Sequence, residues 1–254
     1  MKRFQYGCLQ MEVGDADTYC VVADCDKKAT AVEIPAEVEG VPVVGVADHA
    51  FENCTELVSV TFAEGLKQPP KEGEEGFYIG TRAFAECTAL PEIVIPEGVT
   101  AMGHGAFQCC TALERVQMPD CCCEPYVFYR CEKLKEITPI TDIGEGMFSH
   151  CKSLTTFPVA PGSWIIGEDA FEHCYALTEI TIPASVKRIE QLAFRNCRGL
   201  KRVTFEHTEG WKWKSMYGFS KEPDRSWDVS DPERNAHSLA GEDFDDGVTC
   251  RYRD

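Results

Sequence analysis

The chain has 254 residues, with 25 lysines and arginines against 42 aspartates and glutamates, which gives a formal net charge of −17. Apolar residues make up 44% of the sequence, enough for a folded core, and no apolar run approaches the roughly 18 residues that a membrane helix needs. These features argue against a disordered chain, a membrane-spanning helical protein and a protein that binds nucleic-acid phosphates through clustered basic residues.

The start of the chain lacks the pattern of a secretory leader, because acidic residues interrupt it from Glu12 onward. If Met1 is the natural start, we expect a cytoplasmic protein with reduced thiols, and the odd cysteine count of 15 fits that expectation. A natural chain that begins upstream of Met1 would instead allow a secreted or cell-surface protein. Loose alternation of apolar and polar residues around a turn at Asp24–Lys28 predicts a β-hairpin cap over residues 1–29.

A repeated pattern, Ala-Phe-x-x-Cys-x-x-Leu-x-x-Ile-x-Ile with substitutions, then occurs seven times. Its phenylalanines are separated by 33, 23, 21, 20, 23 and 23 residues and are Phe51, Phe84, Phe107, Phe128, Phe148, Phe171 and Phe194. A period of this length indicates one coil of a solenoid. The Leu-x-x-Ile-x-Ile stretch alternates as a half-buried strand does, and the spacing of Phe, Cys and Leu suits a helical or 3₁₀ turn. Stacked coils would bury these residues in one continuous core.

The predicted solenoid covers residues 30–206, from a partial first coil at Thr30–Pro35 through the seven repeats. The long first interval is explained by a polar surface excursion at 68–76, and residues 121–125 form a second irregular loop. The short interval of 20 residues after Phe128 predicts a shorter loop between the strand of this coil and the next turn. After Phe205 the period ends, and a C-terminal cap is predicted over 207–254. Its aromatic residues would cover the last coil, and its acidic residues form the end of the chain: Trp211, Trp213, Tyr217, Phe219, Trp227, Asp243, Asp245 and Asp246.

The repeats resemble the BspA-type leucine-rich repeats over about residues 30–206. The resemblance implies an α/β, β-rich solenoid with a parallel strand ladder on its concave side and short helical or 3₁₀ turns in each coil. It also implies a non-enzymatic, protein-binding role, often at bacterial cell surfaces and in some protists. It brings no catalytic residue and no cofactor.

Stacking would also align the repeat cysteines in a column: Cys54, Cys87, Cys110, Cys131, Cys151, Cys174 and Cys197. Neighbours about 4.8 Å apart are close enough for disulfides, but side chains in a ladder point the same way. We therefore expect small buried thiols that are structural, like the repeat phenylalanines, with a redox role as the alternative.

Two groups of residues invite a metal hypothesis. His150 and His173 each precede a repeat cysteine on adjacent coils and could share an ion; the alternative is a pair of surface histidines. The run Cys121–Cys123 with Cys109 lacks the converging spacing of zinc ligands, so an oxidation-prone loop is favoured there.

The better candidate for binding is the concave face, where alternation exposes a column of polar residues. We predict contact with a partner at Glu92, Arg115, Glu136, Thr156, Glu179 and Arg202. Equivalent positions in the neighbouring column are largely threonine. The alternative is that any solenoid must present hydrophilic residues on this face.

The sequence thus predicts a non-enzymatic scaffold that binds another protein or peptide. The alternatives are a cell-surface adhesin or receptor-like module that binds host protein or glycan, and a metal-binding protein that uses His150 and His173. Neither the partner nor the oligomeric state follows from the sequence.

Overall fold

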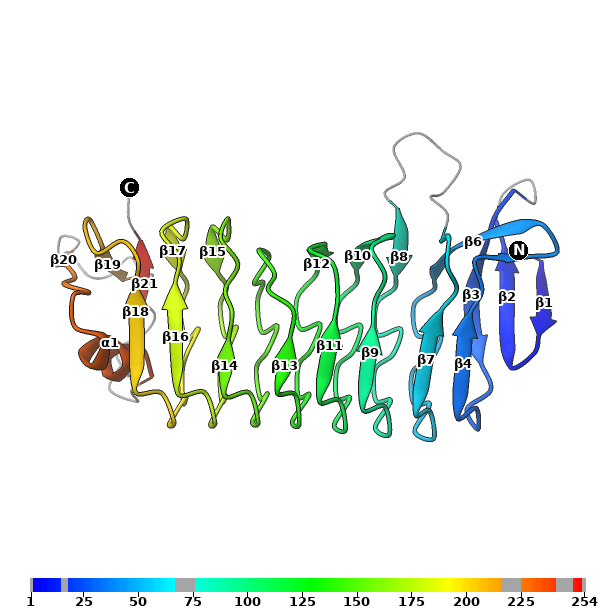
Figure 1. Cartoon of the computed structure of the whole chain (residues 1–254), viewed down its shortest axis with the longest axis horizontal. Helices are drawn as coiled ribbons and strands as arrows, with labels where there is room; N and C mark the ends of the chain where they lie inside the picture. The colour runs from blue at the N-terminus through cyan, green and yellow to red at the C-terminus, as the bar shows by residue number, and fades with distance from the viewer. Residues whose placement is uncertain (1, 15–17, 67–75, 216–224, 241–248, 253–254) are drawn as a thin grey trace. The chain divides into compact units, whose positions relative to one another are not determined.

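The computed structural model describes residues 2–14, 18–66, 76–215, 225–240 and 249–252. They divide into two compact units, Met1–Thr138 and Pro139–Asp254. Both units consist of stacked coils with parallel strands, so the predicted β-rich solenoid is confirmed (Figure 1). Most of the predicted excursion at 68–76 lies outside the described residues, as do Tyr217, Phe219 and the acidic residues 243–246.

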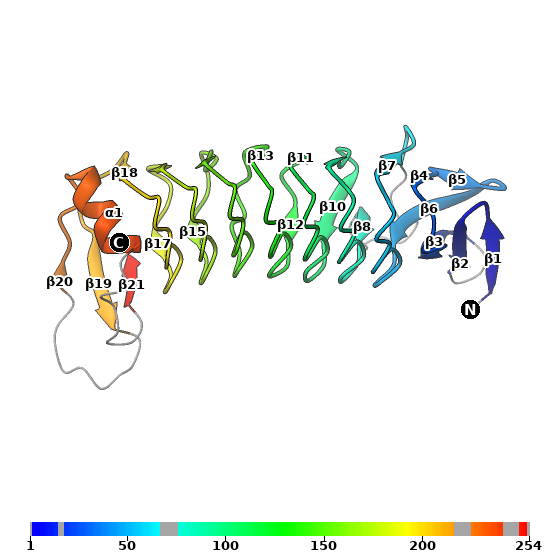
Figure 2. The ribbon, with the colours of Figure 1, turned by 90° about the horizontal axis from the view of Figure 1, so that it is seen from below.

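The first unit contains one large sheet along one side of its coils (Figure 2). It starts with antiparallel strands and continues with parallel ones in the order β1-β2-β3-β6-β8-β10-β12, and β5 pairs with β6. Their bounds are Arg3–Tyr6 (β1), Leu9–Val13 (β2), Cys20–Cys25 (β3), Glu37–Val38 (β5), Val41–Val46 (β6), Phe77–Ile79 (β8), Val99–Met102 (β10) and Cys122–Cys123 (β12). The antiparallel strands β1 to β3 occupy the segment for which the sequence predicts a hairpin cap.

The repeat strands lie on the other side of these coils. They are β4 (Ala31–Ile34), β7 (Ser59–Phe62), β9 (Glu92–Val94), β11 (Arg115–Gln117) and β13 (Glu136–Ile137). β4 pairs with β7, and β13, β11 and β9 form a parallel sheet. Each strand buries its central or alternate apolar residue and exposes the polar ones between, as Val116 and Arg115 show in β11. The alternation read from the sequence therefore sets which side chains face the core.

The turns between the two sheets carry the phenylalanine column. Phe84 and Phe107 are 0% exposed, and their ring centroids lie 5.1 Å apart with the planes 3° from parallel. Phe51 stacks on Phe84 at 4.7 Å, and Phe128 on Phe107 at 5.7 Å. Such offset stacks combine a large buried apolar area with favourable ring geometry. The column forms the interior of the unit.

Backbone hydrogen bonds hold successive turns together. The N–H of Phe84 donates to the carbonyl of Ala106 at 2.7 Å, and the N–H of Phe107 donates to the carbonyl of Val127 at 2.9 Å. Within each turn, the cysteine N–H donates to the phenylalanine carbonyl three residues earlier, a 3₁₀-type bond that Cys87 makes at 3.3 Å. The helical feature predicted for each coil is thus a single tight turn.

Glycine permits the close approach of neighbouring coils at the start of some of the turns. A Cβ atom on Gly103 would lie 2.5 Å from the backbone nitrogen of Thr81, and one on Gly80 would lie 2.5 Å from that of Asp48. Real side chains do not tolerate such distances to backbone atoms. A residue with a side chain here would force the coils apart.

The second unit repeats this plan with a shorter ladder. Its repeat strands are β14 (Thr156–Phe157), β16 (Glu179–Ile182) and β18 (Arg202–Phe205). Its other sheet has the order β15-β17-β21-β19-β20, with bounds Ile165–Ile166, Arg188–Ile189, Thr249–Tyr252, Lys212–Ser215 and Arg225–Ser226. The rings of Phe148, Phe171 and Phe194 stack at 5.5 and 5.3 Å.

Aromatic residues and one helix cover β18. Trp211 and Trp227 are buried, and their ring centroids lie 4.9 and 5.4 Å from that of Phe205. Helix α1 (Pro232–Ala240), the one α-helix among the described residues, packs against β18. Its buried Asn235 donates from Nδ2 to the carbonyl of Val203 at 3.0 Å, which satisfies a carbonyl at the last coil. In the described part of segment 207–254, two tryptophans therefore pack against Phe205 of the last repeat strand.

Candidate functional site

The repeat strands of the first unit place three of the predicted binding residues side by side. The strand register pairs Arg115 with Glu92 on one side and with Glu136 on the other, and all three side chains are exposed. Arg115 donates to the Glu92 Oε2 from Nη2 at 2.8 Å and from Nε at 3.2 Å. Both partners are more than half exposed, so water screens the pair and its contribution to stability is small. The charges are thus available to a partner.

A second column lies beside the first on the same strands. It contains the exposed side chains of Thr61, Val94 and Gln117. Val94, the last residue of β9, is an apolar side chain that is 57% exposed. Thr138 departs from the column, because its hydroxyl donates to the carbonyl of Met118 at 2.8 Å. We call the exposed residues of these two columns on β7, β9, β11 and β13 the strand face of the first unit.

The other three predicted residues form a row in the second unit. The register pairs Thr156 with Glu179 and Glu179 with Arg202, and all three side chains are exposed. Thr181 and Thr204 are paired in the neighbouring column. The structure therefore gathers the six predicted residues into one row of three in each unit.

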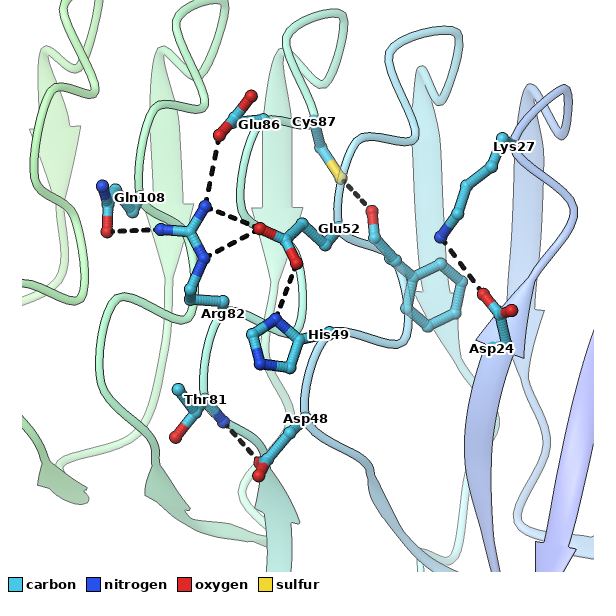
Figure 3. Close-up of polar contacts among 11 residues, drawn as sticks. Asp24, Lys27, Asp48, His49, Glu52, Thr81, Arg82, Glu86, Cys87 and Gln108 are labelled. Atoms are coloured by element: carbon cyan, nitrogen blue, oxygen red, sulfur yellow. Dashed lines mark hydrogen bonds and ion pairs between the residues drawn. The ribbon is translucent and has the colours of Figure 1, made fainter.

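A polar network that the sequence analysis did not foresee covers the turns of the first unit (Figure 3). Arg82 lies at its centre, and its Nη2 and Nε are 2.6 and 2.8 Å from the Glu52 Oε1. Arg82 Nη1 donates to Gln108 Oε1 at 3.0 Å, and Nη2 lies 3.2 Å from Glu86 Oε1. His49 Nδ1 is 2.6 Å from the second oxygen of Glu52. These residues come from three successive coils.

The same network fixes the pKa of the Glu52 carboxyl. Partial burial alone would raise this pKa, but hydrogen bonds from Arg82 and His49 and the Arg82 charge outweigh burial and lower it. Nearby, Asp48 accepts hydrogen bonds from the Tyr78 hydroxyl at 2.5 Å and the Thr81 N–H at 2.8 Å. Since Arg82 and Asp48 are already engaged by neighbouring coils, the network ties coils together and leaves little capacity for a ligand. No signal in the repeat pattern identifies it, because Glu52 and Arg82 are 30 residues apart.

The two histidines of the metal hypothesis lie together in the second unit. The ring centroids of His150 and His173 are 4.4 Å apart. Ser149 Oγ lies 3.0 Å from His150 Nδ1, and His173 Nδ1 lies 2.8 Å from the Tyr175 hydroxyl. Within the described part of the chain, no group of three or more His, Cys, Asp or Glu side chains is arranged to hold a metal ion. Ser149 is 1% exposed, which does not suit a nucleophile that must reach a substrate.

An acidic residue in the same turn as His173 lies near other carboxylates. Asp169 has a left-handed backbone, with φ of 54°, and burial together with the charges of Glu172 and Glu168 raises the pKa of its carboxyl to about 6. Arg195 opposes this rise. The side chain therefore changes charge at a pH well above that of an ordinary aspartate.

The repeat cysteines are 0% exposed, and five of their thiols donate to the carbonyl of the phenylalanine in the preceding coil: those of Cys87, Cys110, Cys131, Cys174 and Cys197. The Sγ of Cys110 donates to the carbonyl of Phe84 in the preceding coil at 3.1 Å, and Cys197 does the same to Phe171 at 2.9 Å. Burial also raises the pKa of the Cys110 thiol, which keeps it protonated and poorly reactive. The prediction of an irregular loop at 121–125 is wrong in part, because Cys122 and Cys123 form β12 and pair with β10. Cys122 is exposed while Cys121 is buried.

Comparison with known proteins agrees with this geometry. The profile of the BspA type leucine rich repeat region matches residues 23–72, 73–163 and 164–221, as six copies. The chain belongs to this family. A leucine rich repeat protein of T. pallidum is 27% identical, with 81% of this chain and 84% of that chain covered and a TM-score of 0.53. A leucine rich cell surface protein of Faecalibacterium prausnitzii A2-165 is 19% identical, with 82% and 96% covered and a TM-score of 0.47. No curated protein matches the chain.

Each turn of this BspA-type chain contains left-handed backbone positions that the repeat pattern does not define by residue type. Two positions in every turn, before the Ala and before the Cys, adopt left-handed backbone conformations with φ between 52° and 65°. The non-glycine residues there include His49, Arg82, Tyr126, Asp169, Leu192, Asn53, Glu86, Cys109, Arg130, His150, His173 and Asn196. Asn, Asp and His are enriched in this conformation, so their recurrence is a signal that could have revealed it. The left-handed backbone at this position is one reason for histidine at 150 and 173.

The family suggests a protein-interaction scaffold. Across the described residues, no helix has the length and apolar character needed to cross a bilayer.

Proposed function

We propose that this BspA-type repeat protein binds another protein through the strand face of its first unit. The observation that carries the proposal is the exposed, mixed-charge row of Glu92, Arg115 and Glu136 beside the exposed Val94. A partner could pair with the charges and cover the apolar side chain in the same contact. Polar complementarity of this kind gives specificity more than raw affinity.

The rigidity of the strands favours such binding. The core-facing residues Ile93 and Val116 are 2% exposed, and the backbone of β9 and β11 is already paired. The exposed side chains therefore project from a fixed frame, and little backbone freedom is lost when a partner binds. Preorganisation of this kind lowers the free-energy cost of association.

The proposal can be tested with two charge-swap variants that leave net charge unchanged. Arg115→Glu/Glu136→Lys alters the strand face. Glu114→Lys/Lys135→Glu swaps an ion pair of 2.8 Å at the corner just before the same strands, and serves as the matched control. The full chain, immobilised, is used to capture proteins from lysate of its native cell, and captured proteins are quantified by mass spectrometry.

We expect specific partners to be captured by the wild type and the control and to fall about tenfold or more with the strand-face variant, as loss of central contacts does. Equal capture of every partner by all three proteins would refute the assignment of the strand face. Thermal melts followed by circular dichroism establish that each variant is folded.

A further inference from the structure

The column of repeat cysteines continues into the antiparallel strands at the start of the first unit. Inside the coils these thiols are buried, and Cys87 for example donates to the Phe51 carbonyl of the preceding coil at 3.3 Å. Cys54 belongs to the first coil with a repeat phenylalanine, so no repeat phenylalanine precedes it in the sequence. Its side chain instead shares a hydrogen bond with that of Cys25, the last residue of β3.

A third thiol, that of Cys8, brings this series of sulfurs to the surface. Leu9 at the start of β2 pairs with Cys25. The Asp26 N–H donates to the Cys8 carbonyl at 2.8 Å, so Cys8 lies across from the end of β3. The Cys25 side chain is hydrogen-bonded to that of Cys8 as well as to that of Cys54. Cys54 is 0% exposed, Cys25 is 5% exposed and Cys8 is partly exposed, so a small molecule reaches the series at Cys8.

We propose that Cys8 and Cys25 form a reversible disulfide, with Cys8 as the thiol that a small disulfide modifies first. Neighbouring strands lie about 4.8 Å apart, within the Cα separations of about 4.4–6.8 Å that disulfides span. The bond joins the turn before β2 to the end of β3. A metal ion shared by the three thiols fits less well, because in the described part of the chain no group of His, Cys, Asp or Glu side chains is placed to hold one.

The chemistry is thiol–disulfide exchange with a small disulfide, such as oxidised glutathione, as the oxidant. The Cys8 thiolate attacks one sulfur of this disulfide and releases one small thiol, which leaves a mixed disulfide on Cys8. The Cys25 sulfur then attacks the Cys8 sulfur and releases the second small thiol. The two protein thiols lose two electrons to the small disulfide, and their protons leave on the two small thiols.

The surroundings of Cys25 decide the order of these steps. The hydrogen bond to Cys54 and burial raise the pKa of the Cys25 thiol, so little of it is ionised and it does not attack first. The mixed disulfide on Cys8 therefore forms before the cross-link. The proposal does not depend on the strand face, and it holds in either cellular location: a reducing compartment keeps the pair as thiols, and an oxidising one closes it.

The test uses the full chain in its native state, incubated with oxidised glutathione. Remaining thiols are then blocked with N-ethylmaleimide, and the peptides are analysed by mass spectrometry. The test variants are Cys8→Ser and Cys25→Ser. The matched control is Cys20→Ser, which removes a buried cysteine of the same strand whose thiol donates to the Pro42 carbonyl at 3.7 Å. Thermal melts followed by circular dichroism establish that each variant is folded.

We expect a Cys8–Cys25 cross-link in the wild type and, in comparable yield, in the Cys20→Ser control, with complete reversal by dithiothreitol. The cross-link is lost in both test variants, and in Cys25→Ser the Cys8 thiol keeps one glutathione. The proposal is overturned if the folded wild type keeps glutathione on Cys8 as the Cys25→Ser variant does. It is also overturned if the cross-link forms only in urea, or if Cys25 is linked to Cys54 in its place.

Discussion

Truncation of one phenylalanine in the stacked column tests the energetics of the fold. Phe107 is 0% exposed, and its ring lies between those of Phe84 and Phe128 at 5.1 and 5.7 Å. Phe107→Ala leaves a cavity that the neighbouring coils cannot close, because the backbone hydrogen bond from Phe107 to Val127 fixes their spacing. We expect the free energy of unfolding to fall by about 3–5 kcal/mol, the cost of removing a buried aromatic ring.

Urea unfolding followed by far-ultraviolet circular dichroism measures this loss. Gln117→Ala, an exposed substitution on the same coil, is the control and should change the free energy of unfolding by less than about 0.5 kcal/mol. All tryptophans lie in residues 164–227, so their fluorescence reports separately on the second unit. A loss below about 1 kcal/mol for Phe107→Ala would show that the stacked column does not carry the stability of the first unit.

Two further predictions concern residues with left-handed backbone. Arg130 is exposed and has a left-handed backbone with φ of 58°. Arg130→Val should therefore lower the free energy of unfolding by about 1–2 kcal/mol, whereas Arg130→Gly should not. Identical urea midpoints for the two variants would contradict the backbone argument. The Asp169 carboxyl has a raised pKa of about 6, so the folded state binds its proton more tightly than the unfolded state, and the contribution of this carboxyl to stability should fall as pH rises from about 4 through 6. Asp169→Asn mimics the protonated form and should raise Tm relative to wild type more at pH 7.5 than at pH 4.5; a Tm difference that does not depend on pH would exclude this origin.

The repeat pattern was sufficient to predict the fold because one physical requirement recurs in every coil. The Phe, Cys and first Ile positions of the repeat are buried, as Phe84, Cys110 and Val116 show. Strand alternation correctly distinguishes these buried residues from exposed ones such as Glu92. The role of the cysteine in each repeat could not be predicted from the sequence. Its Sγ donates to a carbonyl one coil away, a contact that no local spacing reveals.

The candidate sites were predicted only in part. Alternation was enough to place Glu92, Arg115 and Glu136 in one row, but whether they bind a partner stays a prediction. The network around Arg82 was missed because its members differ from coil to coil and meet only through stacking. The cellular location also stays a prediction.

The hydrogen bonds between turns have a consequence for how such a chain can change in length. The Phe51 N–H donates to Ala83, that of Phe84 to Ala106 and that of Phe171 to Ala193, always from one coil to the same place on the next. Duplication of one whole coil in the gene therefore gives every new donor an acceptor without any change to the interior. The protein can lengthen by this route, and each added coil would bring new outward side chains on which selection can act independently.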